Sequence, residues 1–410
     1  MSPKGKSGKS NGNGDPARAA TVIYLTKDSK SPSHAAKLAG IRRYCASRRW
    51  DVKVVARQDF PPEFISSLMR ESRPVGCIVD GVTNRVGLPP RLFRGVPVSY
   101  IGYMRGRTGN RPNFHFDTAA IAETAFRELS ANHPPCYAAV GFPRRMRWPR
   151  QRVEAFRATA CAAGAAFSAF PACKGNPHES WESFCARMVP WLAALPEHCA
   201  IFAVSDEVAV HVVRAAHAAA RHIPRSLTLV SVDNFEELCE SVDPPVSSIQ
   251  LDFERAGFLA ARAVGEQVAH GITKNDGIAP ATPPILVAPL LVVRRKSTSG
   301  HGRHEKFIIE AAGIIRREAC EGLTASDLLK RFPHSRRNFE RRFREAMGHG
   351  ILDEILHVRL ERACSLLAQT DTAIGAIPDM CGFRSYRGLD FHFRSRFKMG
   401  MADWRRKNSR

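Results

Sequence analysis

Two different spacings of hydrophobic residues divide the chain near residue 294. Before that point, short runs of Val, Ile and other apolar residues alternate with longer amphipathic stretches. The runs are nearly continuous in apolarity, as expected for strands that are covered on both faces. They predict strands at 21–25, 51–56, 76–80, 97–102, 137–142, 200–204, 227–233 and 285–293. Helical spacing recurs between them at 34–48, 118–131, 150–164, 206–221 and 253–270.

This alternation of strand and helix predicts a multi-domain chain whose first part is a parallel, doubly wound α/β fold. Because residues 19–293 are more than one such sheet needs, we expect two lobes. The expected divisions of the chain are a disordered basic tail at 1–18, lobe 1 at about 19–133 and 252–293, lobe 2 at about 134–251, and a Gly- and Ser-containing linker at 294–304.

Residues 305–410 show helical spacing only, so we predict a separate all-α domain. Within it, "SRRNFERRFREAMG" (335–348) places Phe339 and Phe343 on one side of a helix and arginines on the other. Ser335 stands where an N-cap is expected. A short helix and a tight turn precede this segment, which predicts a helix-turn-helix at about 324–347.

The same plan recurs at 373–397, where a helix led by Ser385 begins 50 residues after Ser335. The intervening helix, 351–370, carries two apolar stripes and is therefore expected to pack from two sides. One stripe consists of Ile351, Leu352, Ile355, Val358 and Leu366, and the other of Leu356, Leu360, Ala363 and Leu367. Such a helix would direct two recognition helices at successive major-groove faces about 34 Å apart.

The outward arginines allow two interpretations. Arg336, Arg337, Arg341 and Arg344, with Arg387 and Arg394 in the second copy, can contact phosphates and guanine edges. Alternatively, pairs such as Arg336–Glu340 are typical of a solvated surface helix. The second copy favours the DNA interpretation.

Residues 305–407 resemble the AraC-type DNA-binding domain. The residues that carry the resemblance are Ser335, Phe339, Arg341, Phe343, Gly348, Arg359, Leu360, Ala363, Leu366, Leu367, Ile374, Ile377, the run "CGF" (381–383) and Ser385. In that family the outward residues of both recognition helices touch bases, which implies this role for Arg337, Glu340, Arg341, Tyr386, Arg387 and Asp390. Pro378, "KMGM" (398–401) and Phe391 depart from the family pattern; Phe391 stands at an outward place often held by Arg.

Composition restricts the classes of partner that we expect for this protein. A net charge of +22 favours nucleic acid or another anionic partner, and no run approaches the ~18 apolar residues of a membrane helix. The 11 cysteines form no Cys-x-x-Cys, and the start of the chain carries no signal-like apolar stretch, so we expect reduced thiols, no metal, no cofactor and a cytoplasmic location. Two rival functions remain: a sugar- or nucleoside-processing enzyme, and a nonspecific nucleic-acid-binding protein.

Polar residues follow several predicted strands of the first part, where ligands of doubly wound folds bind. They are Asp117, Trp148, Arg152, Ser205, Asp206, Asp233 and Asn234. Carboxylates and a guanidinium can hydrogen-bond sugar hydroxyls, and an indole can cover a sugar face. Asp117 and Asp206 could instead be helix N-caps, and Trp148 could be core.

Residues 21–295 resemble LacI-type, periplasmic-binding-protein-like sensors in "FAVSD" (202–206), "IPRSLTLVSVD" (223–233), "SIQLD" (248–252) and "RVEAF" (152–156). In that family the positions of Asp117, Arg152, Ser205, Asp206 and Asp233 line the effector cleft. A sensor ahead of an AraC-type domain resembles the regulators of xylose operons. The resemblance implies a homodimeric transcription regulator that binds double-stranded DNA and xylose or another monosaccharide, with RNA polymerase as a further candidate partner.

Overall fold

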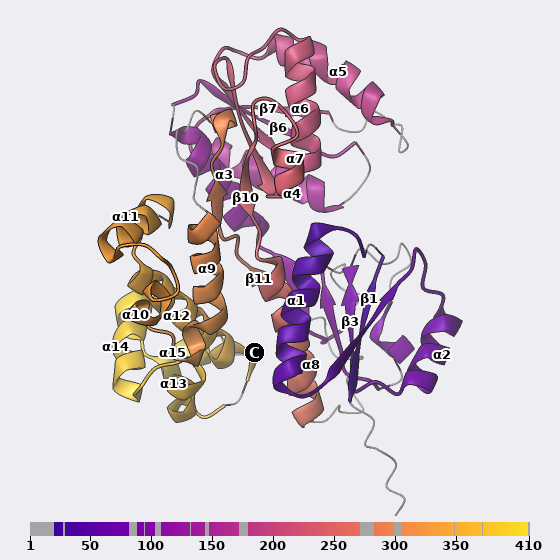
Figure 1. Cartoon of the computed structure of the whole chain (residues 1–410), viewed down its shortest axis with the longest axis vertical. Helices are drawn as coiled ribbons and strands as arrows, with labels where there is room; N and C mark the ends of the chain where they lie inside the picture. The colour runs from indigo at the N-terminus through magenta and orange to yellow at the C-terminus, as the bar shows by residue number, and fades with distance from the viewer. Residues whose placement is uncertain are drawn as a thin grey trace, which may run out of the picture. The chain divides into compact units, whose positions relative to one another are not determined.

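The computed structural model describes residues 20–408 except Asp28, 82–87, Arg94, 103–107, Asn132, 144–146, 172–178, 271–282, 299–305, Gly348 and Asp371. The predicted tail at 1–18 therefore lies outside the described residues. The chain divides into two compact units, Met1–His115 with Ala256–Leu286 and Phe116–Arg255 with Val287–Arg410 (Figure 1).

The first sheet has the strand order β11(Ile285–Val287)-β5(Asn113–Phe116)-β4(Val98–Ile101)-β3(Gly76–Asp80)-β1(Thr21–Thr26)-β2(Asp51–Ala56). β1 pairs in parallel with both β2 and β3, and a helix connects β1 to β2 and another connects β2 to β3. α1(Pro32–Ser47) and α8(Phe253–His270) cover one face, and α2(Pro62–Ser72) lies on the other (Figure 1). Close packing of α8 on α1 requires Gly257, where a Cβ would lie 2.0 Å from the Lys37 carbonyl oxygen.

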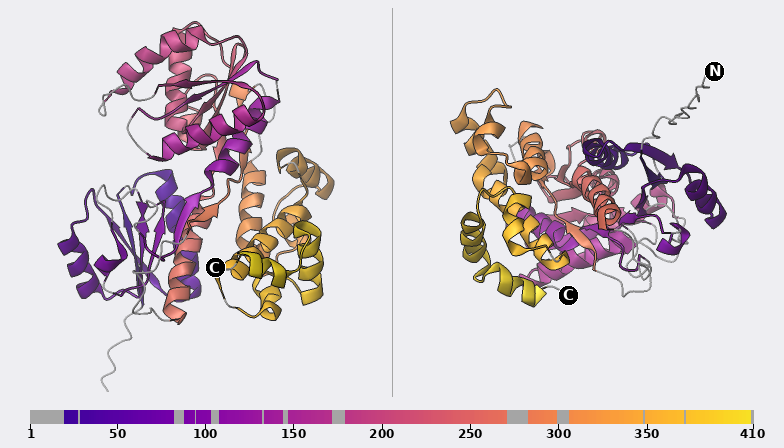
Figure 2. Two further views of the ribbon diagram at one scale, coloured as in Figure 1. Left: turned by 180° about the vertical axis from the view of Figure 1, so that it is seen from behind. Right: turned by 90° about the horizontal axis from the view of Figure 1, so that it is seen from below.

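The second sheet has the order β12(Leu291–Val293)-β10(Ser247–Gln250)-β9(Leu227–Asp233)-β8(Cys199–Ala203)-β6(Cys136–Val140)-β7(Ala166–Phe170). α3(Thr118–Ser130) packs beside α4(Arg147–Ala162), and α5(Trp181–Ala194) packs beside α6(Asp206–Ala218) (Figure 2). The short α7(Glu236–Cys239) follows β9. The expected doubly wound α/β fold is confirmed, with a sheet in each lobe.

Some elements differ from the sequence expectation. The run 285–293 is not one strand: β11 belongs to the first sheet, and β12 pairs antiparallel with β10 in the second. Pro289 separates them, and proline cannot donate to a strand ladder. The sequence pattern also missed β5, β7, β10, α2 and α5.

The C-terminal part is helical, as predicted. It consists of α9(Lys306–Glu318), α10(Ala325–Leu329), α11(Arg336–Met347), α12(Ile351–Gln369), α13(Ile377–Met380), α14(Tyr386–Phe397) and α15(Met401–Asn408). The two helix-turn-helix motifs are α10–α11 and α13–α14. Among the described residues, no helix has the length and apolarity that crossing a membrane requires.

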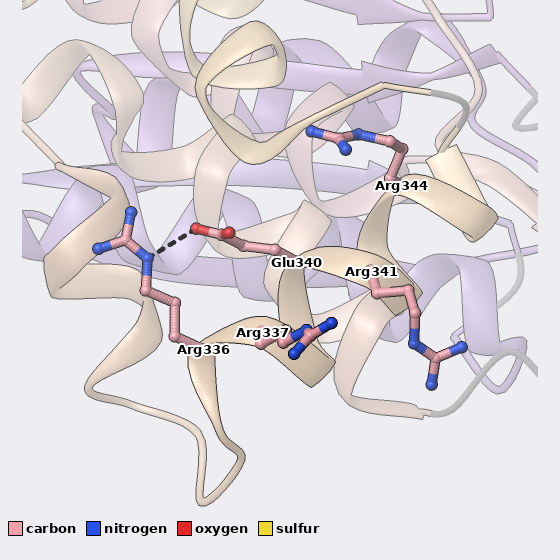
Figure 3. A pocket seen from close by; sticks show the side chains of 5 residues that line it. All are labelled: Arg336, Arg337, Glu340, Arg341 and Arg344. Carbon is pink, nitrogen blue, oxygen red and sulfur yellow. Dashed lines mark hydrogen bonds and ion pairs between the residues drawn. The ribbon is translucent and has the colours of Figure 1, made fainter.

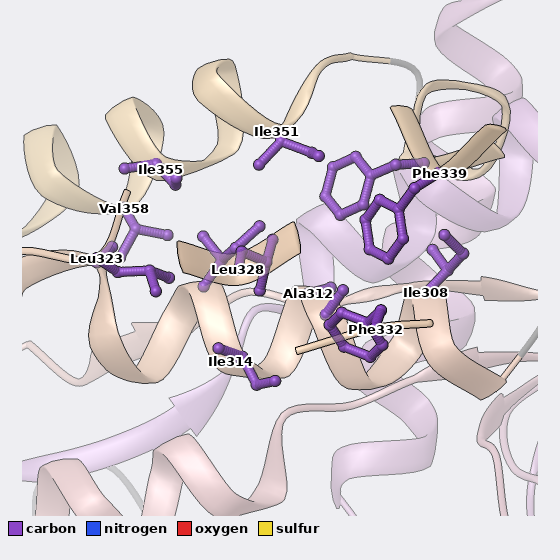
Figure 4. Packing of buried hydrophobic residues seen from close by; sticks show 14 of the residues in the cluster. Ile308, Ala312, Ile314, Leu323, Leu328, Phe332, Phe339, Ile351, Ile355 and Val358 are labelled. Carbon is purple, nitrogen blue, oxygen red and sulfur yellow. The ribbon is translucent and has the colours of Figure 1, made fainter. Parts of the chain in front are cut away.

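The central helix α12 contributes to two separate cores, which confirms that it packs from two sides. Ile351, Ile355 and Val358 join the first core, with Phe339 and Phe343 of α11 (Figure 4). Leu360, Ala363, Leu366 and Leu367 join the second core, with Leu389 and Phe393 of α14. Two assignments to the stripes were wrong: Leu366 packs in the second core, and Leu352 is 69% exposed, because its position on α12 faces neither motif.

The run "CGF" forms the turn between α13 and α14. Gly382 has φ +74°, and a Cβ on it would lie 2.7 Å from the Ala319 carbonyl oxygen, so glycine is required for both reasons. Arg359 of α12 donates to the carbonyl oxygens of Ala319 (2.9 Å) and Leu323 (3.0 Å) and lies over the Phe383 ring. These contacts tie the second motif to the first.

Candidate nucleic-acid interface and effector site

Buried aromatic residues fix the orientation of α11. Phe339 and Phe343 are fully buried, and the Phe339 ring lies 5.1 Å from Phe332 and 5.2 Å from Phe307 between ring centroids. With this side of the helix held in the first core, the opposite side must face outward. The expected inward positions of both phenylalanines are confirmed.

The outward side of α11 is cationic. Arg336, Arg337, Arg341 and Arg344 are exposed, and with Glu340 they line an open groove of about 590 Å³ (Figure 3). Arg336 Nε pairs with Glu340 Oε1 at 2.9 Å, and Arg341 Nη2 donates to Asn338 Oδ1 at 3.1 Å. Exposed pairs of this kind contribute at most about 1 kcal/mol, so a phosphate or a base edge can displace them.

The second recognition helix, α14, has the same design. Ser385 caps it by accepting from Gly388 N, as predicted, while the corresponding role of Ser335 stays a prediction. Leu389 and Phe393 are fully buried in the second core, whereas Tyr386, Arg387 and Arg394 are exposed. Arg394 Nε pairs with Asp390 Oδ2 at 2.7 Å. All the arginines predicted for DNA contact, together with Tyr386, are therefore exposed on α11 and α14, whereas Glu340 and Asp390 are half-buried.

Several predicted ligand residues meet at the carboxyl edge of the second sheet. Arg152 of α4 is 7% exposed; its Nη1 donates to the Val204 carbonyl oxygen at 2.6 Å, and both Nη atoms lie 3.4 Å from Asp233 Oδ1. The Trp148 ring stacks against this guanidinium, 4.7 Å from Arg152 Cζ. A cation, a carboxylate and a half-buried indole thus lie together, although Arg152 and Asp233 are 81 residues apart.

The backbone at this edge is strained. Asp233 and the next residue, Asn234, have φ values of +107° and +54°. Consecutive non-glycine residues with positive φ are uncommon and concentrate at functional sites. Asn234 is held by Ser248 Oγ, which accepts from its backbone N at 3.0 Å, and by Gln250 Oε1, which accepts from its Nδ2 at 2.7 Å.

Asp206 supports this turn from inside the lobe. It is 1% exposed, and its carboxylate accepts from Ser231 Oγ, from Ser248 Oγ at 2.6 Å and from Phe235 N at 2.6 Å. Burial raises the pKa of Asp206, and these hydrogen bonds oppose that effect. Asp206 therefore braces the loop that displays Asp233 and Asn234.

Asp117 and Ser205 are N-caps. Asp117 Oδ1 accepts from Ala119 N and Ala120 N at 3.0 Å each, and Ser205 Oγ accepts from Val208 N at 3.4 Å. The capping alternative for Asp117 is thus what the structure shows, and its contact with an effector stays a prediction, as does that of Ser205.

Sequence reasoning missed Arg295, which we had placed in the linker. Its Nη1 donates to Asn234 Oδ1 at 2.9 Å, and its Nε pairs with Glu240 Oε1 at 2.6 Å. Two residues on, Ser297 is fully buried and donates to the Leu229 carbonyl oxygen at 2.6 Å. The segment after β12 is therefore anchored on β9 and β10, and the Arg295 side chain reaches Asn234 at their carboxyl edge. The only sequence signal was the pair of arginines at its start.

The first sheet has a polar cluster at its own carboxyl edge, which the sequence pattern also missed. Lys37 Nζ pairs with Asp80 Oδ2 at 2.7 Å, and Tyr24 Oη donates to the same oxygen at 3.0 Å. The Tyr24 ring stacks on His34 with centroids 5.2 Å apart. Burial, then the Asp80 charge, raises the pKa of Tyr24, so this phenol stays a donor.

Comparison with known proteins identifies two domain types in the chain. Residues 120–298 match the periplasmic binding protein-like domain, and residues 328–407 match a helix-turn-helix domain. The "Xylose operon regulatory protein" of Escherichia coli (strain K12) is 28% identical over 320 residues, covering 77% of this chain and 79% of the relative. The protein of the same name from Haemophilus influenzae is 30% identical over 233 residues, covering 55% and 57%.

A solved structure described as the "xylose-binding transcription activator xylR" aligns over 95% of this chain and 98% of that one, with 25% identity and a TM-score of 0.50. The "transcriptional regulator CelR-cellobiose complex" aligns over 69% of this chain and 86% of that one, with 18% identity and a TM-score of 0.55, which shows a shared fold. These matches and the geometry above show a chain that joins a periplasmic-binding-protein-like α/β domain to a C-terminal helix-turn-helix domain, and that is similar in this arrangement to the regulatory proteins of xylose operons.

Proposed function

We propose that this protein is a transcription regulator that binds specific double-stranded DNA through α11 and α14 and responds to a small sugar bound by its sensor. The observation that carries the proposal is the matched construction of the two helices. Each buries its apolar side in a separate core of the same domain, and each presents arginines outward. If these arginines served only to keep a surface helix solvated, there would be no reason for a second helix built in the same way.

DNA binding is tested with fragments enriched by the full-length protein from a random-sequence pool. Loss of Arg337 and Arg341 together should weaken binding, relax base preference and reduce the slope of log K against log [salt] by up to about 2, since each phosphate contact contributes about 0.9. Glu321→Gln, on the same domain but off both recognition helices, is the control. Unchanged binding by the double variant would contradict the proposed interface. Enrichment of no sequence would leave only the nonspecific alternative.

The effector is expected at the carboxyl edge of the second sheet. Arg152, Asp233 and Asn234 offer donors and acceptors for hydroxyl groups, and Trp148 offers a flat apolar face. We assign Asp206 the positioning role described above. The relatives named for xylose make pentoses the first sugars to test, followed by other monosaccharides.

A thermal-shift series across monosaccharides tests the sensor, because a ligand present at 100 times its Kd stabilises the folded protein by about 2.7 kcal/mol. Asp233→Asn keeps the shape of the site but removes its charge, and it should abolish the shift. Glu123→Gln, on the surface of α3, should preserve it. Absence of a shift with every sugar would contradict the sensor assignment.

The same proposal covers the remaining partners. We infer that two copies of the chain act together on DNA half-sites, that RNA polymerase is a further partner, and that the protein works in the cytoplasm beside the chromosome. Because the relatives are regulators, we infer binding rather than catalysis at the sugar site. Analytical ultracentrifugation with and without DNA tests the dimer; a single copy on DNA would contradict it.

A further inference from the structure

The two recognition helices can be compared position by position within this chain, since Ser335 and Ser385 are 50 residues apart. The same offset matches Arg337 with Arg387, Phe339 with Leu389, Glu340 with Asp390, Phe343 with Phe393 and Arg344 with Arg394. Cations, acids and buried positions agree in these five pairs, whereas Arg336 is matched by Tyr386. The offset also pairs Arg341 with Phe391, and there a cation is replaced by a large apolar ring.

Phe391 is not part of a core. It is 69% exposed, whereas its neighbours Leu389 and Phe393 are fully buried. It lies about 200° around the helix from Leu389, on the side that faces away from the second core. Its ring makes an edge contact with His392, with centroids 5.2 Å apart. An isolated exposed phenylalanine needs no explanation by itself, but this one lies between two exposed arginines of the same helix.

The surroundings of Phe391 indicate what it contacts. Arg387 precedes it by one helical turn and Arg394 follows it by nearly one turn, and both are exposed. Cations on both sides of an apolar ring suit a polyanion that also offers an apolar group. In the major groove that group is the 5-methyl of thymine, which apolar side chains contact, whereas arginine forks onto guanine O6 and N7.

We propose that Phe391 is a specificity-determining residue that reads a thymine 5-methyl group in the half-site of the second motif, where Arg341 at the same place in the first motif reads guanine. The inference rests on the proposed DNA-binding function and deepens it. It predicts half-sites of different base composition, because the outward residues of the two motifs differ here, as they also do at Arg336 and Tyr386.

A methyl-deletion cycle tests this assignment with the full-length protein and an enriched DNA fragment. Each thymine in the second half-site is replaced in turn by uracil, which removes only the methyl group. At one position we expect uracil to weaken binding by the natural protein about threefold to fivefold, the value of burying one methyl group. Phe391→Ala should bind thymine and uracil fragments equally.

A residue exchange between the two motifs provides a second test. Phe391→Arg gives the second motif the residue of the first, so enrichment from a random pool should replace thymine by guanine at that position, with a preference of about fivefold or more. Met380→Ala is the matched control, because Met380 is an exposed apolar residue of the same motif, 43% exposed, outside the recognition helix. It should retain the sensitivity to uracil.

The possible results distinguish failure of this inference from failure of the proposed DNA-binding function. Equal binding of thymine and uracil fragments by the natural protein, or equal sensitivity in Phe391→Ala, overturns the inference while specific DNA binding stands. Reduced transcription by Phe391→Ala with unchanged DNA binding also overturns it, and indicates a protein partner at this residue instead. Failure to enrich any sequence overturns the proposed function and, with it, this inference.

Discussion

Glu354 holds α9 to the central helix α12, and removing its charge should measurably loosen the helical domain. It is 1% exposed; Arg316 Nε lies 3.1 Å from Oε1, and His349 Nε2 lies 2.8 Å from Oε2. Burial acts to raise the pKa of Glu354, but the His349 hydrogen bond and the Arg316 charge outweigh it and lower the pKa from 4.5 to about 2. A pKa shift of this size corresponds to about 3 kcal/mol of free energy by which the folded state favours the ionised carboxylate.

Because the folded pKa is depressed, this stabilisation is present above about pH 4.5 and is lost as the pH falls toward 2. Glu354→Gln should remove it at neutral pH, leaving the buried Arg316 guanidinium without its carboxylate. About 3 kcal/mol corresponds to a rise of roughly 100-fold or more in the local opening constant.

Amide hydrogen exchange followed by mass spectrometry measures that constant for peptides of α9 and α12. Glu340→Gln is the control, since Glu340 belongs to an exposed pair and should change opening by less than about fivefold. Opening of α9 and α12 within threefold of the natural protein in Glu354→Gln would refute the argument. So would a difference between the two proteins that fails to shrink between pH 4.5 and pH 2.

Two further substitutions test the packing. Phe339→Ala removes a fully buried ring from the first core and should lower the free energy of unfolding by about 3–5 kcal/mol, measured by denaturant titration; a loss below 1 kcal/mol would contradict the packing described. Gly257→Ala should increase hydrogen exchange in α1 and α8, because its Cβ would lie 2.0 Å from the Lys37 carbonyl oxygen, whereas Gly375→Ala, whose Cβ meets no heavy atom of the described chain within 4 Å, should resemble the natural protein.

The sequence predicted elements whose burial is encoded in their own residues. β1, β3, β6 and β8 are mostly apolar along their length, as expected for strands covered on both faces, so each can be recognised without knowledge of its neighbours. β10 is different: Ser247 and Ser248 are fully buried, and their hydroxyl groups are satisfied by Thr298 and Asp206. The residues of β10 alone do not indicate that these two serines are buried, because their hydrogen-bond partners lie far away in the sequence.

The candidate DNA interface was more predictable than the effector site for a similar reason. The outward positions of Arg337, Arg341 and Arg344 follow from one helical wheel anchored at Phe339 and Phe343, whereas Arg336 is exposed because it lies in the first turn of α11. The proposed effector site draws on Arg152, on the turn at Asp233 and Asn234, and on Arg295, which come from separate elements and meet only when the second sheet has formed. Sequence position could place Asp233 at the end of a strand, but it could not assign Arg295 to the same edge.

The strained turn at Asp233 and Asn234 also explains why a buried carboxylate stands behind it. Residues in such conformations cost of order 1–3 kcal/mol each and persist only where the surroundings hold them. The Asp206 carboxylate accepts three hydrogen bonds, from Ser231 Oγ, Ser248 Oγ and Phe235 N, and Ser248 Oγ in turn accepts from Asn234 N. The turn is therefore held by the lobe itself before any ligand arrives. A sugar that binds here need not order the loop itself, so more of its contact energy remains available as affinity.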